Sequence, residues 1–334
     1  MTMSKPCGVR IAGVGSAVPD KRLTNADLAS MVDTSDEWIV QRTGIKERRI
    51  LDRDAGESQC WLATESLRRA LDDASMDAKD LDLIIHASVS SEMTCPSNAC
   101  RVADNLDAGT TGAFDLIAAC CGYVYSMNVA DSLIRSGRHQ AIGVIGCDAM
   151  STLIDYTDRG VSILFGDAAG AAVLTRDEDP NRGCVYQVME GDGRGWPSLF
   201  IPRNERDVPS GVSAPPTQLG CLRMDGREVY KFAVNKFREV IEDALSATGL
   251  SVDDVAQFVC HQSNMRIIES AKAKIGLPDE KVYVNIDRYG NSSSGSVGLC
   301  VDQLWKAGKI NSGDTIIMVA FGGGMTWSSS VWNV

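Results

Sequence analysis

The segment Phe114–Met127, "FDLIAACCGYVYSM", places two adjacent cysteines, Cys120 and Cys121, between an apolar run and a run that can form a helix. A free cysteine often does no more than fill the core of a protein. A thiol at the N-terminus of a helix can instead ionise and act as a nucleophile, because the positive end of the helix dipole stabilises a thiolate. The cysteine pair alone leaves both interpretations open.

A histidine and an asparagine occupy comparable positions in the second half of the chain. His261 directly follows the apolar run "AQFVC", and Asn291 precedes a run that predicts a helix beginning near Ser294. In proteins that alternate strands and helices, ligand sites lie where strands end and helices begin. We therefore expect Cys120, His261 and Asn291 to meet in one crevice.

The elements that must position these residues alternate between strands and helices. Apolar runs that predict buried strands are separated by amphipathic runs that predict helices, which is typical of an α/β fold. Two runs predict buried strands, Leu81–Ser90 and Ala141–Met150, and two predict helices, Ser58–Met76 and the segment from Ala119 to about Arg135. The first cysteine of the pair then lies where a strand gives way to a helix.

The order of elements repeats once along the chain. The segment that begins at Ala70 resembles the one that begins at Ala244, and the strand that begins at Ala141 resembles the one that begins at Thr315. Both pairs are 174 residues apart, because 244 − 70 and 315 − 141 give the same difference. A shared offset predicts duplicated α/β units of about 170 residues each.

Two halves follow from this offset, residues 1–175 with the cysteine and residues 176–334 with the histidine and the asparagine. The segment of about 177–222 is rich in proline, glycine and charged residues, which predicts an irregular cap or joint. Under the offset, Cys120 corresponds to Ser294. The two elements that carry these residues are therefore expected to face each other across a pseudo-twofold axis.

Composition argues against several other classes of function. Hydrophobic residues make up 44% of the 334 residues and charged residues 23%, as expected for a globular protein with a large core. A net charge of -11 argues against a nucleic acid partner. No apolar stretch approaches the ~20 residues of a membrane helix and no signal peptide is recognisable, so we expect a cytoplasmic protein without membrane contact. The eleven cysteines show no CxxC and no zinc-like Cys/His spacing, so neither a metal site nor a disulfide framework is expected.

Six segments give the chain a resemblance to the β-ketoacyl-acyl carrier protein synthase III family of the thiolase superfamily. They occur in the order of the family and span nearly the whole chain, and they are specific as a set although none is specific alone. The segments are "TSDEWIVQRTGIKERRI" (Thr34–Ile50), "FDLIAACCGY" (Phe114–Tyr123), "DYTDRGVSILFGDAAGAAVL" (Asp155–Leu174), "HQSNMRII" (His261–Ile268), "YGNSSSGS" (Tyr289–Ser296) and "FGGGMTW" (Phe321–Trp327).

The resemblance implies a thiolase-like α/β fold whose duplicated halves form a five-layered αβαβα sandwich. It also implies a decarboxylating condensation that initiates fatty acid synthesis, with a coenzyme A thioester as substrate and no cofactor. Cys120 would take the acyl group from an acyl-CoA primer, and malonyl-acyl carrier protein would lose carbon dioxide and attack the acyl-cysteine. His261 Nε2 and the Asn291 amide would stabilise the enolate, and the N–H groups of Cys120 and Gly323 would form the oxyanion hole.

The resemblance further implies where substrates and partners bind. The CoA tunnel would be lined by Thr34, Trp38, Arg42, Arg159, Gly160, Arg227, Tyr230 and Arg266. A basic patch for the acidic acyl carrier protein would comprise Lys231, Lys236, Arg238, Arg266 and Lys272. The chain would act as a homodimer, in which Cys95 of one subunit lines the acyl pocket of the other.

Two cysteines depart from the pattern of the family. Cys121 stands where the family commonly has a small Ala or Ser, although Gly122 and Tyr123 fix the register of the nucleophile on Cys120. Cys95 stands where acetyl-primed members often have an aromatic residue. A side chain this small predicts that acyl groups longer or bulkier than acetyl are accepted.

Three other functions stay open. The chain could be a related condensing or acyl-transfer enzyme of secondary metabolism with a different acceptor, a non-catalytic acyl-CoA-binding scaffold, or a thiol redox protein that uses the adjacent cysteines. The presence of both His261 and Asn291 favours decarboxylation, and adjacent cysteines form a disulfide only in a strained ring.

Arg48 and Arg49 are expected to lie on a solvated face.

Overall fold

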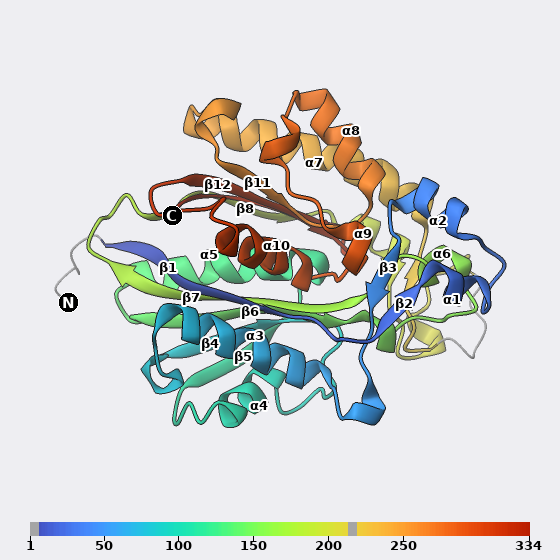
Figure 1. Ribbon diagram of the computed structural model, residues 1–334, viewed down its shortest axis with the longest axis horizontal. Helices are drawn as coiled ribbons and strands as arrows, with labels where there is room; N and C mark the ends of the chain where they lie inside the picture. Colours follow the sequence, from blue (N-terminus) through green and yellow to red (C-terminus); the bar gives the residue numbers. More distant parts are fainter. Residues whose placement is uncertain (1–6, 213–218) are drawn as a thin grey trace.

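The computed structural model describes residues 7–212 and 219–334. Its elements stack in five layers in the order helix, sheet, helix, sheet, helix (Figure 1). The first sheet has the strand order β1-β7-β6-β4-β5, in which β4 is parallel to β5 and β6, and β7 is antiparallel to β6 and β1. Its strands are β1 (Gly8–Ala17), β4 (Leu83–Ala87), β5 (Gly112–Leu116), β6 (Ala141–Ala149) and β7 (Asp167–Asp177).

The second sheet has the strand order β11-β12-β13-β8. Its strands are β8 (Gly183–Gly191), β11 (Gln257–Cys260), β12 (Thr315–Gly322) and β13 (Thr326–Asn333). The predicted irregular cap at 177–222 is therefore wrong for the nine residues of β8, which pair antiparallel with β13. The short strand β9 (Leu199–Phe200) lies within this segment and pairs with β10 (Arg223–Met224), which follows it. The division into residues 1–175 and 176–334 stays a prediction.

Helices fill the space between the sheets and cover both outer faces (Figure 1). The central layer holds α5 (Gly122–Arg135) and α10 (Gly295–Lys306). Two helices cover the first sheet, α3 (Gln59–Ala74) and α4 (Asn98–Asn105), and two cover the second, α7 (Gly226–Thr248) and α8 (Met265–Ile275). This arrangement confirms the predicted five-layered α/β sandwich.

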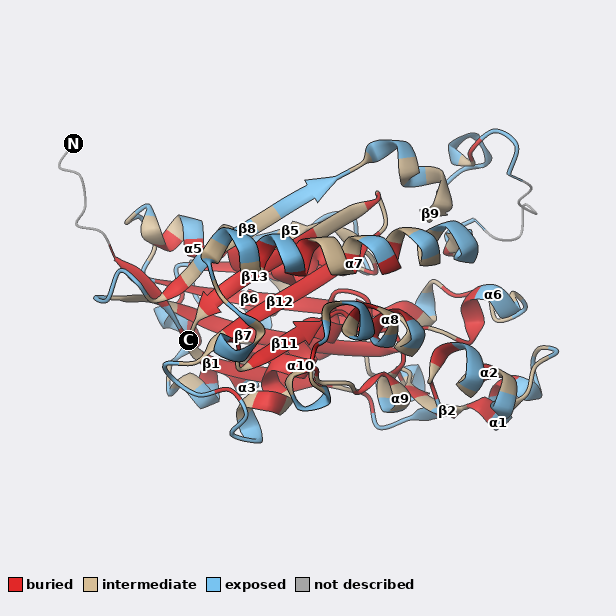
Figure 2. Ribbon diagram, turned by 90° about the horizontal axis from the view of Figure 1, so that it is seen from above, coloured by how far each residue is buried: buried red, intermediate tan, exposed pale blue. Residues whose placement is uncertain are grey.

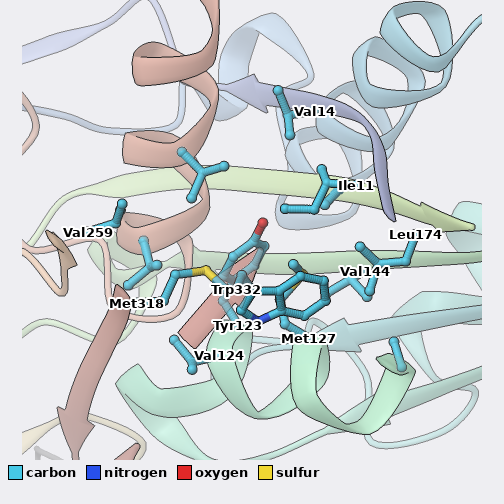
Figure 3. Packing of buried hydrophobic residues seen from close by; sticks show 14 of the residues in the cluster. Ile11, Val14, Tyr123, Val124, Met127, Val144, Leu174, Val259, Met318 and Trp332 are labelled. Atoms are coloured by element: carbon cyan, nitrogen blue, oxygen red, sulfur yellow. The ribbon is translucent and has the colours of Figure 1, made fainter. Parts of the chain in front are cut away.

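The largest apolar cluster lies between the two sheets, around the central helices. Tyr123 and Met127 of α5 pack with Trp332 of β13, Met318 of β12 and Val144 of β6 (Figure 3). Burial of a large apolar side chain contributes about 1.5–3 kcal/mol. The inner strands of both sheets are buried, whereas the edge strands β5 and β8 are largely exposed and the outer helices expose one face (Figure 2). The central helices are therefore fixed from both sides.

Glycines let the start of α10 approach the first sheet and α5 closely. A Cβ on Gly170 would lie 2.2 Å from the carbonyl carbon of Gly298, and a Cβ on Gly146 would lie 2.3 Å from Ser294 O. A Cβ on Gly122 would lie 3.3 Å from Ser294 Cβ. The N-termini of α5 and α10 are therefore neighbours, as the sequence offset predicts.

A group of small elements packs beside one end of the sandwich (Figure 1). They are β2 (Arg22–Thr24), α1 (Asn25–Ala29), α2 (Asp36–Thr43), β3 (Glu47–Arg49), α6 (Arg159–Ser162) and α9 (Ile286–Tyr289). Among the described residues, no helix combines the length and the apolar character needed to cross a membrane.

The expectation that Arg48 lies on a solvated face is wrong, because its side chain is fully buried among these elements. The guanidinium donates to Leu23 O, Asn25 Oδ1 and Ile163 O at 3.1, 2.9 and 2.7 Å. Burial lowers the pKa of Arg48 to about 10. Arg48 thus ties the β2–α1 segment to the residue that follows α6.

Candidate active site

One cavity of about 770 Å³ contains the three residues that the sequence predicts to meet. Cys120, His261 and Asn291 all line it, and so does Gly323 of the glycine turn. The cysteine comes from the first half of the chain, and the other three residues come from the second half. The cavity therefore lies where the ends of the two sheets and of the central helices meet.

The cysteine sits in a short turn, η3 (Ala119–Cys121), between β5 and α5. Ala119 enters this turn with a left-handed φ of 47°, which places Cys120 directly before the first turn of the helix. Cys120 is buried, and its thiol donates to Ser293 Oγ at 3.5 Å. A Cβ on Gly322 would lie 2.8 Å from Cys120 N, so the glycine turn after β12 packs directly on the backbone of the cysteine.

The pKa of Cys120 is raised to about 12, mainly by burial; the hydrogen bond to Ser293 lowers it in part, and nearby Asp148 contributes to the increase. The sequence predicts an easily ionised thiol at the start of a helix. Burial acts in the opposite direction and outweighs the hydrogen bond. Cys120 therefore carries a thiol at neutral pH, and the helix N-terminus reduces the cost of ionisation without removing it.

His261 follows β11, as predicted, and is 1% exposed. Its Nδ1 lies 2.7 Å from Ser296 Oγ, and its ring meets the ring of Phe321 edge-on at 5.5 Å. Burial lowers the pKa of His261 to about 3, so the imidazole is neutral around pH 7. A neutral ring has one N–H donor and one nitrogen acceptor.

The Asn291 side chain is held so that its amide nitrogen is the free group. Its Oδ1 accepts a hydrogen bond from Ser293 N at 2.8 Å. The Asn291 backbone is fixed on both sides, because its N–H donates to Leu164 O and its carbonyl accepts from Gly166 N. Among the described residues, Nδ2 has no acceptor, so it is available as a donor to a ligand in the cavity.

Ser293 is a site residue that the sequence reasoning missed. It contacts the Cys120 thiol through its hydroxyl, Asn291 through its N–H, and Ser296 through its carbonyl. Its φ of 50° is left-handed, which is uncommon for a residue other than glycine. The run of three serines after Asn291 was the available signal, but it also fits an ordinary turn.

The oxyanion hole remains a prediction. Cys120 and Gly323 line the same cavity, and Gly322 packs against the backbone of Cys120.

Cys121 does not line this cavity: it is fully buried and its sulfur accepts a hydrogen bond from Thr326 Oγ1 at 3.5 Å. Burial raises the pKa of the Cys121 thiol, which fits a structural residue rather than a second nucleophile.

Most of the predicted CoA residues line the same cavity. They are Trp38, Arg42, Gly160, Arg227, Tyr230 and Arg266. Trp38 lies between two guanidinium groups, with Arg42 at 5.5 Å and Arg159 at 4.8 Å from the ring. Arg159 and Thr34 lie outside the residues that line the cavity, although Thr34 Oγ1 is buried and has no hydrogen-bond partner within residues 7–212 and 219–334. An aromatic ring flanked by arginines suits a phosphorylated adenine nucleotide.

The predicted carrier-protein patch is less basic than its sequence indicates, because three of its cations have acidic partners. Lys236 pairs with Glu239, Arg238 with Glu242, and Lys272 with both Glu269 and Asp279. Lys231 and Arg266 are exposed. These two residues are therefore the stronger candidates for contact with an acidic partner.

Cys95 is exposed and does not line the cavity of its own chain. It lies in the loop before α4, and Ser91 and Asn98 on either side of it donate to Asp115 of the edge strand β5.

Two family models match the chain. The model described as 3-oxoacyl-[acyl-carrier-protein (ACP)] synthase III matches residues 114–193, and the model of the C-terminal part of the same protein matches residues 245–334. Cys120 lies in the first matched region, and His261 and Asn291 lie in the second. Both regions contribute to the cavity.

Solved structures share the fold across the whole chain. The 3-oxoacyl-[acyl-carrier-protein] synthase III of Aquifex aeolicus superposes with a TM-score of 0.90 at 39% identity, covering 98% of this chain and 100% of the other. The priming β-ketosynthase of the R1128 polyketide biosynthetic pathway superposes with a TM-score of 0.91 at 32% identity, covering 99% of this chain and 98% of the other.

Relatives in sequence are similar over the same extent. The β-ketoacyl-[acyl-carrier-protein] synthase III of Bradyrhizobium diazoefficiens is 43% identical over 326 residues, which cover 96% of this chain and 97% of the relative. The protein of that name from Caldanaerobacter subterraneus is 42% identical over 329 residues, or 98% of each chain. Similarity at this level from one end to the other means that the chain belongs to the β-ketoacyl-acyl carrier protein synthase III family.

Proposed function

We propose that this protein condenses an acyl-CoA primer with malonyl-acyl carrier protein, with loss of carbon dioxide, and so initiates fatty acid synthesis. The observation that carries the proposal is the shared cavity, in which a buried thiol, a neutral imidazole and a free amide N–H come together. The chemistry below needs no cofactor, because the CoA thioester is itself the activated substrate.

The first half-reaction transfers the acyl group to Cys120. The sulfur attacks the thioester carbonyl carbon, the bond from that carbon to the CoA sulfur breaks, and the thiol proton leaves with CoA as its thiol. The tetrahedral intermediate carries negative charge on oxygen, and the N–H groups of Cys120 and Gly323 are proposed to stabilise it. The contact between Gly322 and the Cys120 backbone supports this pairing.

The second half-reaction removes carbon dioxide from the malonyl thioester. The carboxyl carbon–carbon bond breaks, and the electron pair forms an enolate whose oxygen accepts hydrogen bonds from His261 Nε2 and Asn291 Nδ2. The enolate carbon attacks the acyl-cysteine and releases the sulfur, which regains a proton, to give a 3-ketoacyl-acyl carrier protein. A neutral His261 suits this step, since an imidazolium would retain the departing carboxylate.

The cavity mouth is proposed to bind coenzyme A, with Trp38 stacked on the adenine and Arg42, Arg159 and Arg266 near the phosphates. The two guanidinium groups beside the Trp38 ring support this assignment. The acyl carrier protein is proposed to dock beside the same opening, at Lys231 and Arg266. A partner that approaches there would place its phosphopantetheine arm in the cavity.

A homodimer is proposed to form along the edge strand β5. This edge carries two exposed apolar side chains, Phe114 and Ile117, which are 38% and 77% exposed. An unpaired strand edge with apolar side chains is a template for pairing with a second chain. The adjacent loop would then bring Cys95 to the acyl pocket of the other subunit.

The experiment is a condensation assay with malonyl-acyl carrier protein and acetyl-, isobutyryl- and octanoyl-CoA, with the 3-ketoacyl product measured directly. We expect product from at least one primer, turnover of acyl groups larger than acetyl, and loss of product in Cys120→Ala. Absence of product with all three primers would reject the function. A strict preference for acetyl would reject only the proposed role of Cys95.

The second candidate is a priming enzyme of secondary metabolism that uses a different carrier protein or acceptor. The likeness to the R1128 priming β-ketosynthase supports it, although at 32% identity compared with 39% for the Aquifex aeolicus enzyme. Comparing the carrier proteins of fatty acid and polyketide synthesis in the same assay separates the two candidates.

A further inference from the structure

The orientation of His261 depends on one hydroxyl group. Among the described residues, the only hydrogen-bond partner of the ring is Ser296, whose Oγ lies 2.7 Å from Nδ1. Both residues are 1% exposed, so water does not compete freely for this contact. Phe321 packs edge-on against the imidazole and offers it no hydrogen bond. Whatever fixes the proton on the ring must therefore act through Ser296.

Ser296 has one hydroxyl proton and two groups besides His261 within reach. Its Oγ lies 3.0 Å from Ser293 O and 3.4 Å from Gln262 N. The Gln262 N–H can only donate to the hydroxyl oxygen, so the serine proton goes either to Ser293 O or to Nδ1. If the serine hydroxyl donates to Ser293 O, the first arrangement, the ring proton lies on Nδ1. If the hydroxyl donates to Nδ1, the second arrangement, the ring proton lies on Nε2.

The hydrogen bonding of Ser293 O favours the second arrangement. Ser293 O also accepts from the backbone N of Ser296 at 3.3 Å, so it keeps a donor when the hydroxyl turns to the histidine. An imidazole whose Nδ1 accepts from Ser296 presents Nε2–H toward the cavity.

We propose that Ser296 is a positioning residue that selects the tautomer of His261, by donating to Nδ1 and so keeping the proton on Nε2. The inference rests on the proposed function, which needs a donor to the enolate oxygen at Nε2. The hydroxyl acts only on the second half-reaction, because the transfer of the acyl group to Cys120 does not use this donor.

The position of Ser296 suits the task, since it lies in the first turn of α10 and that turn is held in place. The preceding Ser294 donates through its N–H and its hydroxyl to Asp148 at 3.0 and 2.7 Å. A hydroxyl on a fixed helix turn keeps a defined direction better than one on a loop. The histidine itself directly follows β11.

The test separates the two half-reactions in Ser296→Ala. Acyl-Cys120 formation is followed by intact mass, and decarboxylation is followed after malonyl-acyl carrier protein is added to the preformed acyl-enzyme. We expect decarboxylation to slow by about 10- to 100-fold with an unchanged KM, and acylation to stay within about twofold. Ser296→Thr keeps the hydroxyl and should recover most of the rate.

Ser292→Ala is the matched control, because Ser292 is equally buried and its hydroxyl has no partner among the described residues. We expect it to behave as wild type in both half-reactions. Nitrogen NMR of the ring should show Nε2–H in the wild-type protein and a mixture of tautomers in Ser296→Ala. An Nδ1–H ring in the wild type, or equal slowing of both half-reactions in Ser296→Ala, would overturn the proposal.

His261→Ala distinguishes this inference from the function on which it rests. If His261→Ala decarboxylates at the wild-type rate, the proposed role of the histidine is wrong. If His261→Ala is slow and Ser296→Ala is as fast as wild type, only the role of Ser296 is wrong.

Discussion

Burial and helix position act on the Cys120 thiol in opposite directions, and the balance can be measured. Burial raises its pKa to about 12, so the thiolate fraction should still be rising in the neutral range. We expect the rate of acyl-Cys120 formation to increase about tenfold per pH unit between about pH 6 and 9, because only the thiolate attacks. Peptide-resolved mass separates Cys120 from the exposed Cys95. A rate that levels off above about pH 7 would show that the helix N-terminus outweighs burial.

The buried imidazole of His261 predicts a different pH dependence for the second half-reaction. Burial lowers its pKa to about 3, so the ring stays neutral until the solution is far more acidic than pH 6. We expect decarboxylation by preformed acyl-enzyme to vary less than about twofold between about pH 6 and 8. A decrease toward acid with a midpoint near the ordinary histidine pKa would contradict the neutral ring.

At the level of single residues, the sequence predicted that Cys120, His261 and Asn291 line one crevice, but it did not predict the contacts that hold their side chains in place. Cys120, His261 and Asn291 could be found because each lies next to a predicted element. Ser293 could not, since its contacts depend on a left-handed backbone and on packing between two halves of the chain. A serine beside an asparagine has the same sequence signature in any turn.

At the level of the elements, helix α7 carries two basic residues, Lys231 and Arg238, whose contributions to carrier-protein binding can be compared directly. Lys231 is exposed and follows Tyr230, which lines the cavity, whereas Arg238 further along the helix pairs with Glu242 at 3.8 Å. We expect Lys231→Glu to raise the KM for malonyl-acyl carrier protein by about three- to tenfold, and Arg238→Glu to change it by less than about twofold. The KM for acyl-CoA serves as the internal reference. Equal effects of both substitutions would show that the patch is wider than Lys231 and Arg266.

The sequence predicted helices and strands correctly where the apolar pattern that specifies them lies within the element itself. The strands and central helices follow from apolar runs and from the repeat, and α5 ends at Arg135 as predicted. Strand β8 was missed because it is an edge strand whose polar and apolar residues alternate weakly, and its partner β13 lies more than a hundred residues later. Arg48 was misread because its oxygen partners come from two segments, at Leu23–Asn25 and Ile163, that lie far apart in the sequence, which no local pattern reveals.

At the level of the whole molecule, the proposed dimer predicts that one substitution on the β5 edge lowers the mass measured in solution from that of two chains to that of one. Phe114→Glu puts a charge on the β5 edge, where pairing with a second chain would bury it. We expect the wild-type protein to sediment at twice the mass of the chain, and the variant to dissociate at micromolar concentration. Met31→Glu, at a residue that is 54% exposed and away from that edge, should leave the dimer intact. A monomeric wild type would reject the dimer and with it the contribution of Cys95.

The most direct measurement follows the mass of one peptide through both half-reactions. The protein is incubated with an acyl-CoA, digested and analysed, and a second sample receives malonyl-acyl carrier protein before digestion. We expect the acyl mass on the peptide that contains Cys120, and its disappearance in the second sample as the 3-ketoacyl product forms. In Asn291→Ala the acyl mass should form and then persist. An acyl group on another residue, or none on any peptide while product still forms, would contradict the acyl-cysteine mechanism.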